Sequence, residues 1–443
     1  MKLLQKSQNE VFKNIVVGQL GSYNLPNARQ GYKSYEQGVI EGHMQTDAYL
    51  ARISRGHLSI NVCFMPKPLM RIPYTGRMPD PIIVPRSANT PTGSIAALTE
   101  FLTAKSPNTT HQHRPLSEQT VLLTGAGISV ASGLADYRGT NGTYTLNKTY
   151  RPIYFNEFVS NHEARKRYWA RSFLGWTNLN KSKPNPAHLA VKDLGELGLL
   201  SKVITQNVDS FHNQAHPHLP TLELHGYLRS LICLTCHREY SRAKFQSQLA
   251  RLNPAWADFL ASALASGALD TEHPEERRKK GLKTNPDGDV DLPDAPYNTF
   301  RYPACPSCLA SPPSKTLDGE VARVEVDSEG AWLENSNAGV LKPAVIMFGE
   351  SIAAEVKLAA ERAIDEAGRI LVIGSSLATY SAWRLVKRAK ERGMPIGILN
   401  LGGARGEEGF FADVLGGNKG ELGVRCSQSA DKILPEVVKN VRR

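Results

Sequence analysis

The stretch Val121-Leu-Leu-Thr-Gly125-Ala-Gly127-Ile-Ser129 places a short apolar run directly before two closely spaced glycines. Such a run is typical of a strand that is buried on both faces of a sheet. A glycine loop that follows a strand is where backbone amides and a helix N-terminus can bind a pyrophosphate. Taken alone, the loop fits a tight structural turn equally well.

This loop departs from the dinucleotide-binding fingerprint of dehydrogenases in two ways. The fingerprint has a third glycine where Val130 stands here, and an acidic residue about 20 positions further on that holds the adenosine ribose. The next glycine in this chain is Gly133, and no acidic residue occurs near position 145. An ordinary dehydrogenase is therefore disfavoured.

Strand and helix patterns alternate on both sides of an irregular middle region. Strands are expected at 121–124, 203–205, 222–224, 343–348, 370–373 and 396–399. Helices are expected after Ser94, which can act as an N-cap, from Asn185 and Pro186, and at 352–367 and 383–392. The alternation predicts an α/β fold with a doubly wound, Rossmann-like parallel sheet and a smaller inserted domain.

The expected domain boundaries follow from these patterns. Residues 1–92 are expected to form an N-terminal extension that is poorly ordered or serves targeting. The two halves of the Rossmann-like domain are expected at 93–228 and 341–438, and a small cysteine-bearing domain with long insertions at 229–340. The helical part of the small domain is expected at 150–182.

Polar residues follow several of the expected strands. The segments that carry them are Gln206-Asn207-Val208-Asp209 after the second strand, His225 after the third, Gly374-Ser375-Ser376 after the fifth, and Asn400 after the sixth. Each could be a turn or a cap, but together they indicate the ligand crevice that open α/β sheets form at the carboxyl ends of their strands.

His225 ends a buried strand, precedes a glycine and lies beside this presumed crevice. No G-x-S-x-G nucleophile elbow accompanies it, so a serine hydrolase is not supported. A general base acting on a bound hydroxyl fits better.

Four of the six cysteines form two C-x-x-C pairs, Cys233 with Cys236 and Cys305 with Cys308. Four thiolates are the ligand set of a closed structural zinc site. The 68 residues between the pairs imply a large excursion but do not prevent closure. Redox pairs or free thiols are the alternatives, and the absence of a secretory apolar region indicates a reducing compartment.

Composition sets further bounds on the partners of this chain of 443 residues. Its net charge of +11 indicates acidic partners, such as dinucleotide phosphates, acidic protein surfaces or nucleic acid. The densest basic run, at 277–280, favours a solvated loop over a nucleic-acid patch. No stretch reaches the roughly 18 apolar residues of a membrane span, so a membrane partner is not expected.

Several motifs, in this order along about 94–438, resemble the sirtuin family: Gly125-Ala-Gly-Ile-Ser, Asp136-Tyr-Arg138, Gln206-Asn-Val-Asp209, Leu224-His-Gly226, the paired cysteines and Gly374-Ser-Ser376. Three others are most similar to the mitochondrial sirtuin-4 type of class II: Arg167-Tyr-Trp-Ala-Arg171 with Gly175-Trp176, Asn185-Pro-Ala-His188, and Asn285-Pro-Asp-Gly-Asp289. The chain departs from the family at Ala135, at Tyr137 and in the long segment 309–340.

The resemblance implies a dinucleotide-binding domain, a small zinc-ribbon domain with one structural Zn²⁺, and a cleft where NAD and acylated protein lysines meet. His225, Asn207 and Asp209 would be catalytic. The NAD contacts that it implies are Gly125, Ala126, Gly127, Ile128, Asp136, Tyr137, Arg138, Tyr144, Gln206, Asn207, Val208, Asp209, Gly374, Ser375, Ser376, Asn400, Leu401, Gly402 and Cys426.

The family's activity would be NAD-dependent deacylation, in which the acyl group moves from lysine to ADP-ribose and nicotinamide is released. NAD is then a co-substrate. Tyr168 and Arg171 resemble a pair that binds acidic acyl groups, so a carboxyl-bearing or bulky acyl group is expected over acetyl; an exposed helix pair is the alternative.

Two other functions stay open, mono-ADP-ribosyl transfer to protein side chains and a non-catalytic zinc- and NAD-binding module. Localisation in the mitochondrial matrix is a family-level expectation, with nucleus or cytoplasm as alternatives. The Arg-rich, acid-poor segment at 70–92 is weakly similar to a transit peptide.

Overall fold

The structure is a computed structural model that describes residues 78–104, 119–146, 150–266, 269, 283–286, 288–292, 295–316, 318–414 and 417–443. Cys63, the basic run at 277–280 and most of the expected N-terminal extension lie outside these residues. Within the described part of the chain, no helix combines the length and apolar character needed to cross a membrane.

The larger unit is built on a six-stranded parallel sheet with the order β11-β10-β9-β1-β2-β3, which confirms the predicted fold class. Its strands are β1 (Thr120–Thr124), β2 (Leu200–Thr205), β3 (Thr221–Glu223), β9 (Arg369–Ile373), β10 (Ile396–Leu399) and β11 (Gly423–Cys426). The strand order reverses between β1 and β9, and in doubly wound sheets ligands bind at the strand ends beside that reversal.

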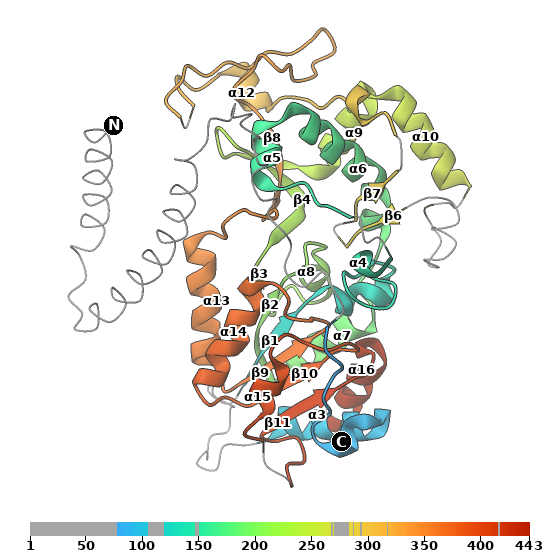
Figure 1. Ribbon diagram of the computed structural model, residues 1–443, viewed down its shortest axis with the longest axis vertical. Coiled ribbons are helices and arrows are strands. Elements are labelled where there is room, and N and C mark those ends of the chain that lie inside the picture. The colour runs from blue at the N-terminus through green and yellow to red at the C-terminus, as the bar shows by residue number, and fades with distance from the viewer. Residues whose placement is uncertain are drawn as a thin grey trace, which may run out of the picture. The chain divides into compact units, whose positions relative to one another are not determined.

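Helices cover both faces of this sheet (Figure 1). One face packs against α3 (Pro91–Thr103), α7 (Pro186–Glu196) and α16 (Ala430–Val441), and the other against α13 (Ala354–Glu366), α14 (Tyr380–Glu391) and α15 (Glu407–Phe411). Side chains alternate between the faces, since Leu122 joins the first core while Val121 and Leu123 join the second. This double burial explains why the strands read as unbroken apolar runs.

The smaller unit holds a three-stranded antiparallel sheet of β5 (Glu239–Ser241), β4 (Gly226–Cys233) and β8 (Leu341–Val345). Its core includes three of the paired cysteines and residues of the surrounding helices. Those helices are α5 (Phe155–Ser160), α6 (His162–Lys181), α9 (Arg242–Leu252), α10 (Pro254–Ala265), α12 (Pro306–Ala310) and the short η4 (Tyr297–Thr299). A two-stranded hairpin, β6 (Lys283–Thr284) with β7 (Val290–Asp291), completes it.

The strand expected at 343–348 belongs to this smaller sheet, and its assignment to the parallel sheet is wrong. β8 pairs antiparallel with β4, and Leu341 lies opposite Cys233. Both side chains are buried in the core of the smaller unit. The boundary expected at 341 therefore lies too early, because the chain returns to the parallel sheet only after β8.

The boundary expected at residue 92 lies too late. Ala88, in the short helix η1 (Arg86–Asn89), is fully buried against the parallel sheet's core, and Val84 forms an antiparallel bridge with Arg425 beside β11. The predicted cap at Ser94 is also wrong. The Thr90 hydroxyl accepts the hydrogen bond from Gly93 N–H, since Pro91 opens α3, and buried Ser94 donates to the carbonyl of Ala88 at 2.8 Å.

Three histidines are buried together below the ends of β1 and β2. His212, in α8 (Phe211–Ala215), lies 2.9 Å from the Thr124 hydroxyl through Nε2 and 2.9 Å from His216 through Nδ1. The His188 ring packs edge-on against that of His212, with ring centres 5.0 Å apart. Burial lowers the pKa of all three rings, to about 3 for His188, so the folded chain keeps them neutral.

These histidines predict acid sensitivity. Below pH 6.5 the unfolded chain protonates the three rings and the folded chain does not, so the free energy of unfolding falls as pH falls, by up to about 1.4 kcal/mol per pH unit for each ring. Urea unfolding between pH 7.5 and 5 should show this slope, and His216→Asn should reduce it. The exposed His218 gives the control, because His218→Asn should leave the slope unchanged. Equal slopes in both variants would contradict the assignment.

Candidate active site

The loops after β1 and β9 cross in direct backbone contact. Gly125 N–H donates to Ile373 O at 3.0 Å, and Gly127 N–H donates to Gly374 O at 2.8 Å. Gly374 has φ of 62°, and a Cβ there would lie 2.3 Å from the backbone nitrogen of Ile128. The close approach that dehydrogenases obtain from a third glycine is therefore supplied here by the opposite loop, and Val130 stands 46% exposed in η3 (Ala126–Ser132).

Gln206 joins the ends of three strands. Its Nε2 donates to Thr124 O at 3.2 Å and to the Ser375 hydroxyl at 2.8 Å. Its Oε1 accepts from the Thr379 hydroxyl at 3.0 Å. Gln206 and Ser375, which the sequence placed at separate strand ends, thus lie together.

Asn207 and Asp209 meet on one buried hydroxyl, that of Ser129. The amide of Asn207 donates to Ser129 Oγ at 3.1 Å, and Ser129 donates to Asp209 Oδ2 at 2.7 Å. Burial raises the pKa of Asp209, while hydrogen bonds from Phe211 N–H and Ser129 lower it. Sequence reasoning quoted Ser129 as part of the loop but missed its role, because nothing in the spacing marks it as the link between the two residues.

His225 lies beside Gln206, two residues after the end of β3. Its Nδ1 is 3.1 Å from the carbonyl oxygen of Gln206, and since a carbonyl only accepts, Nδ1 carries the proton. Burial lowers the pKa of the His225 imidazole to about 4, so the ring is neutral near pH 7. Its Nε2 is then unprotonated and accepts a hydrogen bond from the Ser381 hydroxyl at 2.8 Å. The sequence did not indicate this partner.

A separate compact loop carries Asp136, Tyr137 and Arg138. It leads into α4 (Thr143–Leu146), which contains Tyr144. Asp136 accepts from Gly139 N–H at 2.9 Å, and burial raises the pKa of its carboxyl group. The Tyr137 and Tyr144 rings stack at 5.5 Å, with the Arg138 guanidinium 5.0 Å from the Tyr144 ring centre. This loop does not share the hydrogen bonds described above for His225 and Gln206.

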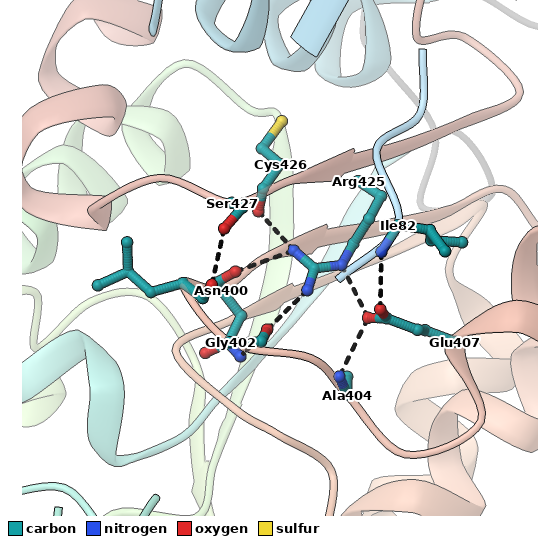
Figure 2. Close-up of polar contacts among 9 residues, drawn as sticks. Ile82, Asn400, Gly402, Ala404, Glu407, Arg425, Cys426 and Ser427 are labelled. Carbon is teal, nitrogen blue, oxygen red and sulfur yellow. Dashed lines mark hydrogen bonds and ion pairs between the residues drawn. The ribbon is translucent and has the colours of Figure 1, made fainter. Parts of the chain in front are cut away.

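The buried Arg425 guanidinium contacts Asn400, Gly402 and Cys426 at the ends of β10 and β11 (Figure 2). The Asn400 amide donates to Gly402 O at 2.7 Å, and Leu401 is 64% exposed. The Cys426 carbonyl accepts from both Asn400 N–H and Arg425. Arg405 N–H donates to Ser376 O at 2.9 Å, which connects this group to the β9 loop.

Tyr168 and Arg171 have different neighbours although both lie on α6. Tyr168 packs edge-on against Phe158. Arg171, 4% exposed, forms an ion pair of 2.7 Å with Asp289 from the β6–β7 hairpin. A Cβ at Gly175 would lie 1.6 Å from Gly288 O, so the hairpin turn lies directly on the helix. An acidic acyl group would therefore compete with Asp289 for this guanidinium.

The four paired cysteines form a cluster, as the sequence predicted. All four sulfur atoms lie within 4.8 Å of one another, with 3.6 Å from Cys233 to Cys308 and 3.7 Å from Cys236 to Cys305. Tetrahedral zinc with bonds of about 2.3 Å separates its ligands by about 3.8 Å. The four thiolates thus fit a structural Zn²⁺, because four ligands complete its tetrahedron.

A doubly wound sheet, a cysteine-bearing antiparallel unit and a neutral histidine at the strand ends define a class of dinucleotide-binding protein, and the comparisons specify it. The pattern of the Sir2 family matches residues 125–381. Over 294 residues the chain is 41% identical to NAD-dependent protein deacylase SIR4 of Batrachochytrium dendrobatidis, covering 66% of this chain and 83% of the relative.

Two further relatives agree. NAD-dependent protein deacylase SRT2 of Arabidopsis thaliana is 35% identical over 66% of this chain and 68% of its own length. The human NAD-dependent protein lipoamidase sirtuin-4, mitochondrial, is 33% identical over 66% of this chain and 77% of its own length. The chain belongs to the Sir2 family, and within that family it resembles the sirtuin-4 type.

The crossing of the two glycine loops predicts an asymmetry between two alanine substitutions. Gly374 and Gly393 both have positive φ, but a Cβ at Gly393 meets nothing within 4 Å. Gly393→Ala should lower the free energy of unfolding by about 1 to 2 kcal/mol through backbone strain alone. Gly374→Ala should lower it by a further 1 to 3 kcal/mol, roughly the effect of overpacking. Urea unfolding measures both, and equal losses would show that the crossing is not tight.

Proposed function

We propose that this protein is an NAD-dependent protein-lysine deacylase, which transfers the acyl group of an acyl-lysine to ADP-ribose and releases nicotinamide. The observation that carries the proposal is His225. It is neutral, its Nδ1 proton is held by the Gln206 carbonyl, and its unprotonated Nε2 accepts a hydrogen bond from the Ser381 hydroxyl. Asn207 and Asp209, which share the buried Ser129 hydroxyl, follow Gln206 in the chain.

Different residues at the strand ends would contact different parts of NAD. Gly125, Gly127, Ser375 and Ser376 would hold the phosphates, because the crossing of their loops marks the topological switch point. Asn207 and Asp209 would hold the nicotinamide end. The loop at 400–402 would meet the adenosine end. Asp136, Tyr137, Arg138 and Tyr144 would close over NAD from their own loop.

NAD, when bound, supplies a ribose carbon that the acyl-lysine oxygen can attack as nicotinamide leaves. The residues of the chain position the two substrates and remove a proton from a ribose hydroxyl. His225 Nε2 would take a proton from a ribose hydroxyl, and the oxygen of that hydroxyl would then attack the acyl carbon. The cysteine cluster holds the antiparallel sheet that carries β4, which begins at the residue after His225. Zinc held by the four thiolates would have a structural role.

Acylated protein lysines are the proposed substrates, and the sirtuin-4 resemblance supports placement in the mitochondrial matrix. The acyl preference is proposed to be for bulky or carboxyl-bearing groups over acetyl. Since Asp289 already neutralises Arg171, bulky neutral groups are favoured in the native chain.

The proposed reaction predicts its products. Incubation with NAD and an acyl-lysine peptide should give free lysine, nicotinamide and O-acyl-ADP-ribose in equal amounts by mass spectrometry. His225→Tyr should lower kcat by about 10²- to 10⁴-fold, the usual contribution of a general base, and should leave zinc content unchanged. The exposed His218→Asn variant is the control.

Other product patterns would support other functions. An ADP-ribosyl adduct on protein without O-acyl-ADP-ribose would indicate a mono-ADP-ribosyltransferase. Binding of NAD with no consumption would indicate a non-catalytic module. Full turnover in His225→Tyr would remove the general-base assignment.

The ion pair between Arg171 and Asp289 predicts a change of selectivity. Asp289→Asn removes the competing charge, so the turnover ratio of glutaryl-lysine to acetyl-lysine peptide should rise about tenfold or more, the worth of a buried charged hydrogen bond. Asp291→Asn is the matched control, because Asp291 lies 3.9 Å from Arg171 and should give a smaller change. If the wild type, Asp289→Asn and Arg171→Met all show the same turnover ratio of glutaryl-lysine to acetyl-lysine peptide, Arg171 does not contact the acyl group.

A further inference from the structure

Arg425 is a fully buried arginine whose guanidinium is used almost entirely by backbone carbonyls. Its Nη1 donates to Asn400 O at 2.9 Å and to Cys426 O at 2.6 Å, and its Nη2 donates to Gly402 O at 2.6 Å (Figure 2). Three carbonyl groups at the ends of β10 and β11 thus accept hydrogen bonds from one guanidinium group. The path of the loop at 400–402 is set by this side chain.

Glu407 completes the arrangement from the start of α15. Its Oε2 accepts from Arg425 Nε at 2.8 Å and from Ala404 N–H at 3.0 Å, and both charged side chains are at most 3% exposed. The five residues from Asn400 to Ala404 are therefore held at both ends, by the arginine at one end and by the glutamate at the other.

The glutamate also holds the segment at 79–84, which the sequence places in an N-terminal extension that is poorly ordered or serves targeting. Ile82 N–H donates to Glu407 Oε1 at 3.0 Å, and Val84 exchanges two backbone hydrogen bonds with Arg425. A Cβ at Gly403 would lie 1.8 Å from Pro79 O, so this segment also lies directly against the loop. One buried ion pair thus joins the N-terminal segment, β11 and the loop.

Stability alone does not account for such a pair. Replacing a buried ion pair by apolar residues of similar volume is often neutral or stabilising, because the desolvation of both charges offsets their attraction. A guanidinium, by contrast, fixes several acceptors in one plane. A loop of five residues with two glycines, Gly402 and Gly403, has many accessible conformations, and these bonds select one of them.

We propose that Arg425 and Glu407 are positioning residues for the adenosine end of NAD, with the segment at 79–84 as their brace. The proposal rests on the proposed NAD site. Neither side chain touches the ligand. They preorganise the loop at 400–404, so that the adenosine half binds without first ordering it. The reacting end of NAD lies near His225 and should be unaffected.

The experiment compares the full-length variants Arg425→Lys, Glu407→Gln and Gly403→Ala with the wild type. Lysine keeps the charge but loses the planar fork, glutamine keeps the shape but loses the charge, and the added methyl at Gly403 displaces Pro79 without altering the ion pair. Each should raise KM for NAD on the order of tenfold to a hundredfold, the effect of a misplaced binding group, with kcat at saturating NAD unchanged. Calorimetric affinity for ADP-ribose should fall by the same factor, and inhibition by nicotinamide alone should not change.

Arg165→Lys is the matched control. Arg165 is also buried, donates to the carbonyls of Phe158 and Val159, and lies in the smaller unit. The Arg165→Lys variant should lower the thermal midpoint of unfolding, as Arg425→Lys should. It should leave both the KM for NAD and the affinity for ADP-ribose at their wild-type values.

The outcomes separate the two proposals. If wild-type protein binds ADP-ribose and the three variants bind it equally well, the positioning role is overturned and the NAD site stands. If the variants lose kcat rather than KM, or Arg165→Lys raises KM as much as they do, the effect is general destabilisation and the role is likewise overturned. If the wild type binds no ADP-ribose, the proposed function fails and the positioning role fails with it.

Discussion

The structure depends on the contact between the loops that follow β1 and β9. Gly127 donates to the carbonyl of Gly374, and no side chain fits between the two backbones. This contact occurs where the strand order of the sheet reverses. The parallel pairing of Thr124 with Thr205 and Ile373 aligns the ends of β1, β2 and β9, and Gln206 there bonds to Thr124 and Ser375 at once. The position of His225 follows, because its Nδ1 is bonded to the backbone of Gln206.

Two buried polar groups then set the ends of the proposed NAD site. The Ser129 hydroxyl joins Asn207 to Asp209 at the nicotinamide end, and the Arg425 guanidinium gathers the carbonyls at the adenosine end. Each group is hydrogen-bonded to several partners, which offsets the cost of removing it from water. Both therefore rigidify the strand ends before any ligand binds, as electrostatic preorganisation requires.

The sequence predicted the parts whose chemistry is local and left out those that depend on tertiary contact. Apolar runs identified the strands of the parallel sheet, and the two C-x-x-C pairs identified the thiolate cluster. A strand run does not say which sheet it joins, so β8 was assigned to the parallel sheet although it pairs with β4. Ser129, Ser381 and Glu407 carry no motif, and their roles arise from partners 80, 156 and 18 residues away in the chain. For the same reason the sequence predicts a site for acidic acyl groups at Arg171 but does not indicate that Asp289 forms an ion pair with this arginine.

The most direct test of the account is a crystal structure of the protein with bound ADP-ribose. The account places the pyrophosphate against Gly125, Gly127 and Ser375, the adenosine against the loop at 400–402, and the free ribose beside His225, with the Arg425 contacts unchanged from the ligand-free protein. ADP-ribose bound away from the ends of β1 and β9, or bound there in the reverse orientation, would contradict it.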